Sequence, residues 1–107
     1  MVKNPKKATP TNCPIEQTLA LIVGKWKTVI LWHLSSGTKR YSELRRLIPE
    51  VSEKMLIHSL RDLEKNLLVQ RNVYHEVPPR VEYSLSKKAQ TLTPILASID
   101  SWGKKHL

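Results

Sequence analysis

Residues 42–66 carry apolar and charged residues that each recur at helical spacing. In the second half of this stretch the apolar positions follow one another at intervals of four, three and four, and share one helical face: Leu56, Leu60, Leu63 and Leu67. A second set has the same spacing on another face: Lys54, His58, Arg61 and Lys65. The pattern predicts an amphipathic helix with one buried face and one exposed, positively charged face.

A shorter helix is expected before it. Leu44, Leu47 and Ile48 form an apolar i, i+3, i+4 set, and Pro49 then interrupts the helix. Ser52 is a suitable N-cap for the next helix. Two short helices joined by a tight turn are typical of the helix-turn-helix, whose second helix enters the DNA major groove. Because any amphipathic surface helix shows such a stripe, the second helix alone is weak evidence for DNA binding.

Two further helices precede this stretch. Cys13 and Pro14 start the first, since proline suits the first helical position. Its apolar face is formed by Ile15, Leu19 and Ile22. A second helix runs from about residue 25 to 35, is apolar on most sides, and is expected at the centre of a small bundle. Gly37 ends it.

The region after Asn66 predicts a β-hairpin. Residues 69–75 and 81–85 are rich in valine and tyrosine, and a short strand is also compatible with residues 38–41. Asn66 is expected to take the left-handed conformation that ends the preceding helix. Between the two β-prone runs lies a stiff Pro78-Pro79 loop, which places Arg80 at the tip of a wing that spans about residues 69–85.

The C-terminal segment predicts a helix with a wide apolar face. Ser86 caps a short helix, and Thr93-Pro94 starts a longer one over about residues 93–105. In a chain this small, we expect a partner subunit to cover the apolar faces of the first and last helices; the alternative is that the last helix folds back on its own domain. The expected interface residues are Ile15, Leu19, Ile22, Leu92, Ile95, Ile99 and Trp102.

Composition favours a nucleic-acid partner. The 107 residues include 18 lysines and arginines against 9 acidic residues, a formal net charge of +9. The length suits one domain over residues 13–107, preceded by a flexible basic tail over residues 1–12. The tail can reach a phosphate backbone, although solvated lysines are its simpler role. No apolar run can span a membrane and no secretory signal is present, so a cytoplasmic protein is expected.

Catalytic chemistry is not indicated. The single cysteine excludes an intramolecular disulfide and a cysteine-based zinc cluster, and the four histidines are scattered. No glycine-rich phosphate loop and no nucleophile with a nearby base are evident. We therefore expect no enzyme activity, no metal and no cofactor. The sequence identifies no small-molecule effector.

Several motifs together resemble one family. They are Cys13-Pro14-Ile15-Glu16, Gly24-Lys25-Trp26, residues 39–44 (KRYSEL), 60–64 (LRDLE) and 77–85 (VPPRVEYSL), and Trp102-Gly103. In this order the chain resembles the HxlR-type winged helix-turn-helix transcriptional regulators of bacteria and archaea. Members often have Asp-Gly where this chain has Asn66-Leu67, and a glycine where it has Ala89-Gln90. These departures concern local geometry and do not touch the expected DNA-facing positions.

The resemblance implies a mostly helical α+β fold, a winged helix-turn-helix with additional N- and C-terminal dimerisation helices. It further implies a homodimer that binds a palindromic double-stranded DNA operator, with the helix from Ser52 in the major groove and Arg80 at phosphate or the minor groove. The alternative function is a winged-helix protein–protein interaction module. Lysines on the outer helix face argue against it, because lysine is depleted at protein interfaces.

Expected DNA contacts divide into two groups. Phosphate contacts are assigned to Lys39, Arg40, Arg45 and Arg80, although Lys39 and Arg40 also suit a solvated loop. Base contacts are assigned to the exposed part of the second helix: Ser52, Lys54, Met55, His58 and Arg61. Arg61 has the alternative of an ion pair with Glu64, so Lys54, Met55 and His58 rank above it.

Cys13 is the remaining residue that can carry chemistry. A helix N-terminus stabilises a thiolate, which is the form that reacts with oxidants and electrophiles. Some members of the resembled family are similar in using an N-terminal cysteine as a switch through an intersubunit disulfide or an adduct. The alternative is a small buried apolar residue at the dimer interface.

Overall fold

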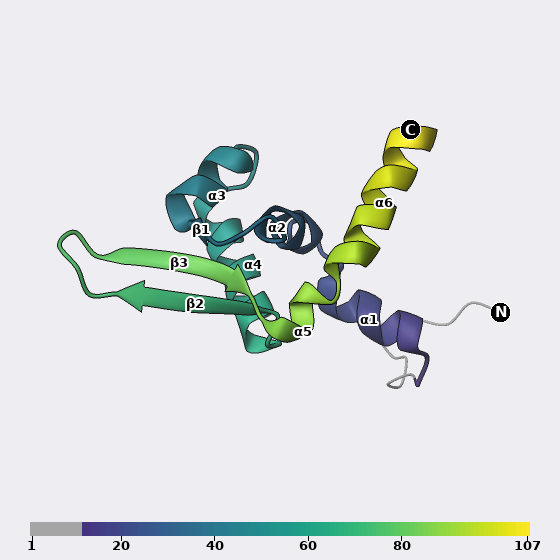
Figure 1. Cartoon of the computed structure of the whole chain (residues 1–107), viewed down its shortest axis with the longest axis horizontal. Coiled ribbons are helices and arrows are strands. Elements are labelled where there is room, and N and C mark those ends of the chain that lie inside the picture. Colours follow the sequence, from purple (N-terminus) through teal and green to yellow (C-terminus); the bar gives the residue numbers. More distant parts are fainter. Residues whose placement is uncertain (1–11) are drawn as a thin grey trace.

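The computed structural model describes residues 12–107, so the predicted flexible tail lies outside the described residues except for Asn12. The described part contains six helices and three strands (Figure 1). In chain order these are α1 (Pro14–Ile22), α2 (Lys27–Leu34), β1 (Lys39–Arg40), α3 (Tyr41–Leu47), α4 (Glu53–Lys65), β2 (Val69–Tyr74), β3 (Arg80–Leu85), α5 (Lys87–Gln90) and α6 (Thr93–His106). None of these helices is long and apolar enough to cross a membrane.

Helices α3 and α4 form the predicted helix-turn-helix. The Ser52 hydroxyl accepts a hydrogen bond from the Met55 backbone N–H at 3.1 Å, which confirms Ser52 as the N-cap of α4. On α3 the core is reached by Leu44 and Ile48, whereas Leu47 is exposed. Of the apolar set on this helix, Leu47, the last residue of α3, is therefore the one that does not belong to the core.

The apolar face of α4 ends one turn earlier than the spacing predicts. Leu56, Leu60 and Leu63 are fully buried, but Leu67 is 70% exposed because the helix ends at Lys65. The chain reverses through Leu67, whose φ is +62°, while Asn66 keeps a negative φ of −89°. The expectation that Asn66 takes the left-handed conformation is thus wrong, and Leu67 takes it instead. Leu68 then enters the core in its place.

The end of α4 is a Schellman motif. The Leu68 N–H donates to the Leu63 carbonyl at 2.9 Å, and the Leu67 N–H donates to the Glu64 carbonyl at 3.0 Å. The Asn66 side-chain amide donates to the Asp62 carbonyl at 3.0 Å. These bonds satisfy carbonyl groups at the helix end and turn the chain directly into β2.

A three-stranded antiparallel sheet in the order β1-β3-β2 covers one side of the helices. The register pairs Val69 with Leu85 and Tyr74 with Arg80, so β2 and β3 form the predicted wing. The wing extends away from the helical core, and its loop lies at one end of the molecule (Figure 1). Alternation along the strands puts Arg71, Val81 and Tyr83 on the sheet face toward α4.

Helices α1 and α6 lie at the other end of the molecule from the wing loop (Figure 1). Pro14 stands in the first turn of α1 and Pro94 in the first turn of α6, as predicted. Ser86 caps α5 through a hydrogen bond from the Ala89 N–H. The fold is the predicted mostly helical α+β winged helix-turn-helix.

Candidate nucleic-acid interface

The outward face of α4 is a polar, positively charged surface on a rigid helix. The predicted base-contacting residues are all exposed on it: Ser52, Lys54, Met55, His58 and Arg61. The opposite side of the helix is buried in the core, which leaves this face free for a ligand. A helix that presents charged and apolar side chains together has the chemistry to contact base edges in a major groove.

An ion pair fixes α4 to the centre of the protein. Lys27 Nζ on α2 lies 2.7 Å from Asp62 Oδ2 on α4, and the lysine side chain is largely buried. The hydrogen bond from Lys27 lowers the pKa of Asp62 below its usual value, and burial of the carboxylate opposes this. The pair therefore holds Asp62 charged and links α2 to α4.

Strand β1 and helix α3 contribute basic residues that differ in their exposure to solvent. Arg40 is exposed, and its backbone N–H donates to Glu43 Oε1 at 2.8 Å, while Lys39 Nζ donates to Ser36 Oγ at 3.2 Å. Arg45 is half-buried, and its Nη1 is buried without a hydrogen-bond acceptor. Of the predicted phosphate contacts on this side, Arg40 is the most accessible to DNA.

The Arg80 side chain is engaged within the wing, and it is not at the tip as predicted. Arg80 begins β3, with Nη2 3.1 Å from Glu76 Oε2 and Nε 3.5 Å from Glu82 Oε2. Its guanidinium also lies over the Tyr74 ring, 4.3 Å from the centroid, and 28% of the side chain is exposed. The hairpin register places these groups together, because Tyr74 is the cross-strand partner of Arg80.

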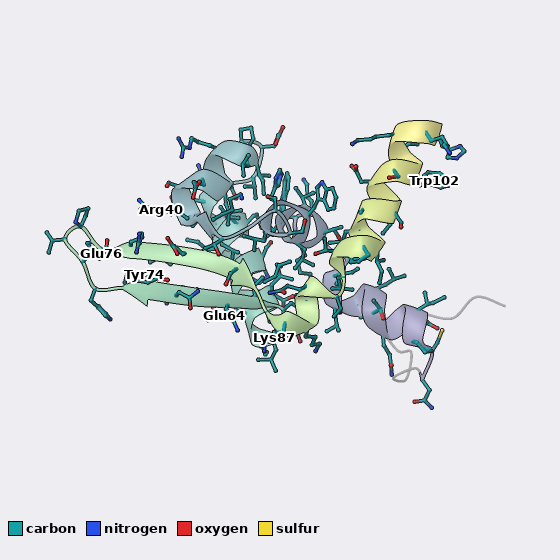
Figure 2. All side chains as sticks on the ribbon, in the orientation of Figure 1. Arg40, Glu64, Tyr74, Glu76, Lys87 and Trp102 are labelled. Carbon is teal, nitrogen blue, oxygen red and sulfur yellow. The ribbon has the colours of Figure 1, made fainter. Side chains whose placement is uncertain are left out.

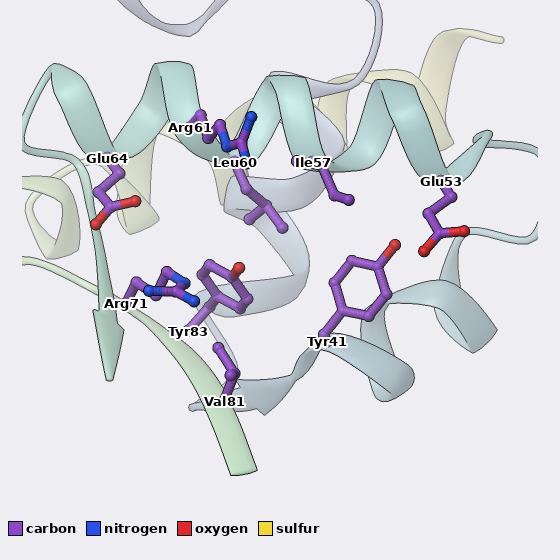
Figure 3. A pocket seen from close by; sticks show the side chains of 9 residues that line it. All are labelled: Tyr41, Glu53, Ile57, Leu60, Arg61, Glu64, Arg71, Val81 and Tyr83. Carbon is purple, nitrogen blue, oxygen red and sulfur yellow. The ribbon is translucent and has the colours of Figure 1, made fainter. Parts of the chain in front are cut away.

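A cleft of about 500 Å³ separates α4 from the sheet (Figure 3). Its walls combine apolar, aromatic and charged side chains from both elements: Tyr41, Glu53, Ile57, Leu60, Arg61, Glu64, Arg71, Val81 and Tyr83. Burial, followed by the nearby Glu53 carboxylate, raises the pKa of Tyr41. Of these lining residues only Arg61 was predicted as a site residue, and Ile57 and Arg71 are among those that sequence reasoning missed. Their position depends on the strand register and on which face of α4 packs toward the sheet.

Most of the predicted dimer residues are exposed at the end of the molecule opposite the wing. Ile15 and Leu19 on α1 and Ile95, Ile99 and Trp102 on α6 all present apolar surface to solvent. Figure 2 shows Trp102 on α6 far from Glu76 in the wing. Such a concentration of exposed large apolar side chains is typical of a protein-interaction surface.

Two predicted interface residues lie elsewhere. Ile22 is only 4% exposed and belongs to the core of its own protomer, because it ends α1 where the chain turns toward α2. Leu92 packs against the same core from the N-cap of α6. Neither residue therefore presents a large apolar surface to solvent.

Cys13 is the N-cap of α1, as predicted, and it is exposed. Its carbonyl accepts a hydrogen bond from the Gln17 N–H at 3.0 Å, the first bond of the helix. The alternative, that Cys13 is buried at a dimer interface, stays a prediction, since its exposure here is that of a single chain. Among residues 12–107, no group of three or more histidine, cysteine, aspartate or glutamate side chains is placed to hold a metal ion.

Comparisons with known proteins agree with this geometry. A family model described as HxlR-like helix-turn-helix matches residues 21–107. The uncharacterized HTH-type transcriptional regulator YdeP of Bacillus subtilis (strain 168) is 46% identical over 94 residues, which cover 88% of this chain and 73% of that protein.

Two redox-related solved structures are also similar. The redox regulator HypR in its oxidised form is 45% identical with a TM-score of 0.84, covering 89% of this chain and 98% of that one. The transcriptional regulator YodB from B. subtilis in its reduced form is 33% identical with a TM-score of 0.77, covering 90% of this chain and 95% of that one. A structure of diamide-treated YodB is also similar. The family, YdeP and YodB are regulators of transcription and not enzymes. The chain belongs to the HxlR-like helix-turn-helix family of transcriptional regulators.

Proposed function

We propose that residues 13–107 act as one DNA-binding domain of a homodimer that recognises a palindromic double-stranded operator. In this proposal α4 enters the major groove and the wing lies beside it. The observation that carries the proposal is the outward face of α4, where Lys54, His58 and Arg61 surround Met55 on a helix that is capped and fixed from behind. Lysine and arginine pair with guanine acceptors, and apolar side chains contact the thymine methyl.

Affinity arises mainly from neutralised phosphates in this proposal. Arg40, Lys39 and the accessible part of Arg45 lie on the elements that precede α4, where a DNA backbone passes a helix-turn-helix. Release of counterions then makes binding fall steeply as salt increases. Arg80 contributes less than its position in the sequence suggests, because Glu76 and Glu82 neutralise it.

The dimer is supported by the exposed apolar side chains of α1 and α6. Two copies that bury these faces against each other place two α4 helices on the same side of the dimer, as a two-fold operator requires. The two half-sites are then expected about one helical turn apart, roughly 34–36 Å.

Cys13 adds a redox response to this proposal. Cys13 is exposed at the start of α1, next to the proposed dimer face. This position and the similarity to the redox regulator HypR support the proposed redox response. Oxidation by diamide transfers two electrons and two protons from two Cys13 thiols to the azo group, and leaves one disulfide between subunits. In this proposal the disulfide shifts the two recognition helices relative to each other.

A DNA titration tests the proposal. The wild-type protein, reduced or treated with diamide, is titrated against the promoter fragment next to its gene at two salt concentrations. Lys54→Ala is expected to weaken selective binding at least tenfold, whereas Lys88→Ala on the distant α5 changes it little. Absence of selective binding by reduced and oxidised wild type would contradict the proposed function.

The redox part has its own controls. A non-reducing gel after diamide treatment should show a covalent dimer for wild type and none for Cys13→Ser. The DNA affinity of wild type should change with oxidation, and that of Cys13→Ser should not. A diamide-treated wild type that runs only as monomer removes the disulfide while leaving the DNA-binding proposal in place.

A further inference from the structure

Ile57 stands between two hollows on the surface of α4. One is the cleft toward the sheet, where Figure 3 shows it beside Leu60 on the side of the helix toward Tyr41. The other is a hollow on the outward face, lined by Lys54, Met55, Ile57, His58 and Arg61. Ile57 is only half-buried, whereas its neighbours Leu56 and Leu60 are fully buried. Part of its side chain is therefore available to a ligand in the outward hollow.

Cationic residues flank Ile57 along the helix. Lys54 lies three residues before it and Arg61 four residues after it, so the three side chains adjoin on one surface row. An apolar contact between two cations is unsuited to a protein partner, because lysine is depleted at the centre of such interfaces. The same arrangement suits a DNA major groove, where an apolar methyl group adjoins hydrogen-bond acceptors and phosphates.

We propose that Ile57 is a specificity-determining residue that contacts the 5-methyl group of a thymine in each operator half-site. This inference rests on the proposed function and assigns a base to it. The 5-methyl group is the one apolar group that an unmodified base pair presents in the major groove. Lys54 and Arg61 on either side contact acceptors of the adjacent base pairs or phosphates.

Ile57 suits this role better than Met55. Its β-branched side chain has few χ1 rotamers, so its position is defined before DNA binds. Methionine is unbranched and flexible, and it fits several shapes equally well. A side chain discriminates between bases when its contact is lost in the absence of the thymine 5-methyl group. Because the isoleucine side chain is stiff, it cannot move to form another contact instead.

Deletion of one methyl group on the DNA tests the proposal without altering the protein. An operator is first selected from a pool of random duplexes with the wild-type protein. Each thymine of one half-site is then replaced in turn by deoxyuridine, which lacks only the 5-methyl group. One replacement is expected to weaken binding about fourfold, since burial of a methylene-sized group contributes roughly 0.8 kcal/mol.

Protein variants assign the contact to Ile57. Ile57→Ala should bind the thymine and deoxyuridine duplexes equally, and Ile57→Val should retain part of the difference. Leu47→Ala, at an exposed apolar position on α3 that lines neither hollow, is the matched variant and should keep the full difference. Melting temperatures of all three are measured to show that they are folded. An equal loss on deoxyuridine for wild type and Ile57→Ala, or no loss at any thymine, would overturn the proposal.

Two further outcomes separate the possible causes. A duplex with 5-methylcytosine at the critical position should bind more tightly than one with cytosine, because the methyl group occupies the same place; equal affinities would contradict recognition of the methyl. If the random pool yields no selected sequence, the proposed function itself fails and the assignment of Ile57 fails with it. A selected operator that is insensitive to deoxyuridine overturns only the assignment.

Discussion

Lys27 on α2 and Asp62 on α4 form an ion pair, with 2.7 Å between Nζ and Oδ2, that joins the central helix to the proposed recognition helix. The lysine side chain is 16% exposed and the aspartate side chain 38%. Asp62 is adjacent in sequence to Arg61, which is exposed on α4. The ion pair therefore fixes the position of the helix turn that presents Arg61.

Asp62→Asn is expected to destabilise the fold by roughly 1 kcal/mol, because it leaves a largely buried lysine without its counter-charge while solvent screening limits the loss. The folded-state pKa of Asp62 is lowered, so the pair stabilises the fold fully above the unfolded value of 3.8. This stability is lost as pH falls through the lowered folded pKa. Urea unfolding at pH 7 and at about pH 3 should therefore show a smaller pH effect in the variant than in wild type.

Asp100→Asn is the matched control for this measurement. Asp100 pairs with Lys104 at 3.0 Å on α6, but the lysine side chain there is 78% exposed. Its replacement should alter the free energy of unfolding by a few tenths of a kcal/mol at most. Equal effects of the two substitutions would show that the Lys27–Asp62 pair has no special structural role.

Leu67→Gly is expected to increase the free energy of unfolding by roughly 0.5 kcal/mol. A left-handed backbone costs an L-residue about 1–2 kcal/mol, and glycine avoids this cost while losing more chain entropy on folding. The Leu67 side chain is mostly exposed, so little packing is lost. Asn66→Gly should instead destabilise, since φ is negative there and the amide bond to Asp62 disappears. Thermal unfolding of both variants decides which residue forms the turn.

The two ends of α4 show which features of a helix a local sequence pattern can predict. The start of α4 was predictable, because the Ser52 cap is a local interaction between a hydroxyl and the backbone N–H of Met55, three residues further along the chain. Its end was not, because the reversal into β2 depends on where the strand must pair. The spacing therefore assigned Leu67 to the core, and tertiary structure puts Leu68 there.

In the candidate site, too, some features follow from local sequence and others depend on tertiary packing. The exposed residues of α4 followed from helical spacing, since one face of an amphipathic helix is buried. The surroundings of Arg80 depend on the hairpin register, which brings Tyr74 opposite it and closes the loop that carries Glu76. The positions of Arg71 and Ile57 depend on how the sheet packs against α4, and a single sequence contains no local signal for that packing.

Glu76→Gln is expected to strengthen DNA binding two- to threefold and to make its salt dependence steeper. The substitution removes one of the two carboxylates that neutralise Arg80, and its guanidinium becomes available to a phosphate. Binding to a non-specific duplex is measured over a series of salt concentrations. Asp100→Asn changes the net charge equally at the other end of the molecule and should leave the slope unchanged. A slope that does not differ between Glu76→Gln and wild type would contradict this account of the wing.

If the proposed homodimer forms through α1 and α6, Ile99→Glu is expected to give a monomer that remains folded. Ile99 lies on α6 between Ile95 and Trp102, and more than half of its side chain is exposed in the protomer. A charge there is tolerated in the monomer but must be desolvated in an interface, which costs several kcal/mol. Sedimentation equilibrium should show a monomer, and thermal unfolding a folded domain. Leu47→Glu, an equally exposed apolar position on α3, should remain dimeric. A wild type that is monomeric throughout, or an Ile99→Glu variant that stays dimeric, would place the apolar face of α6 outside the dimer interface.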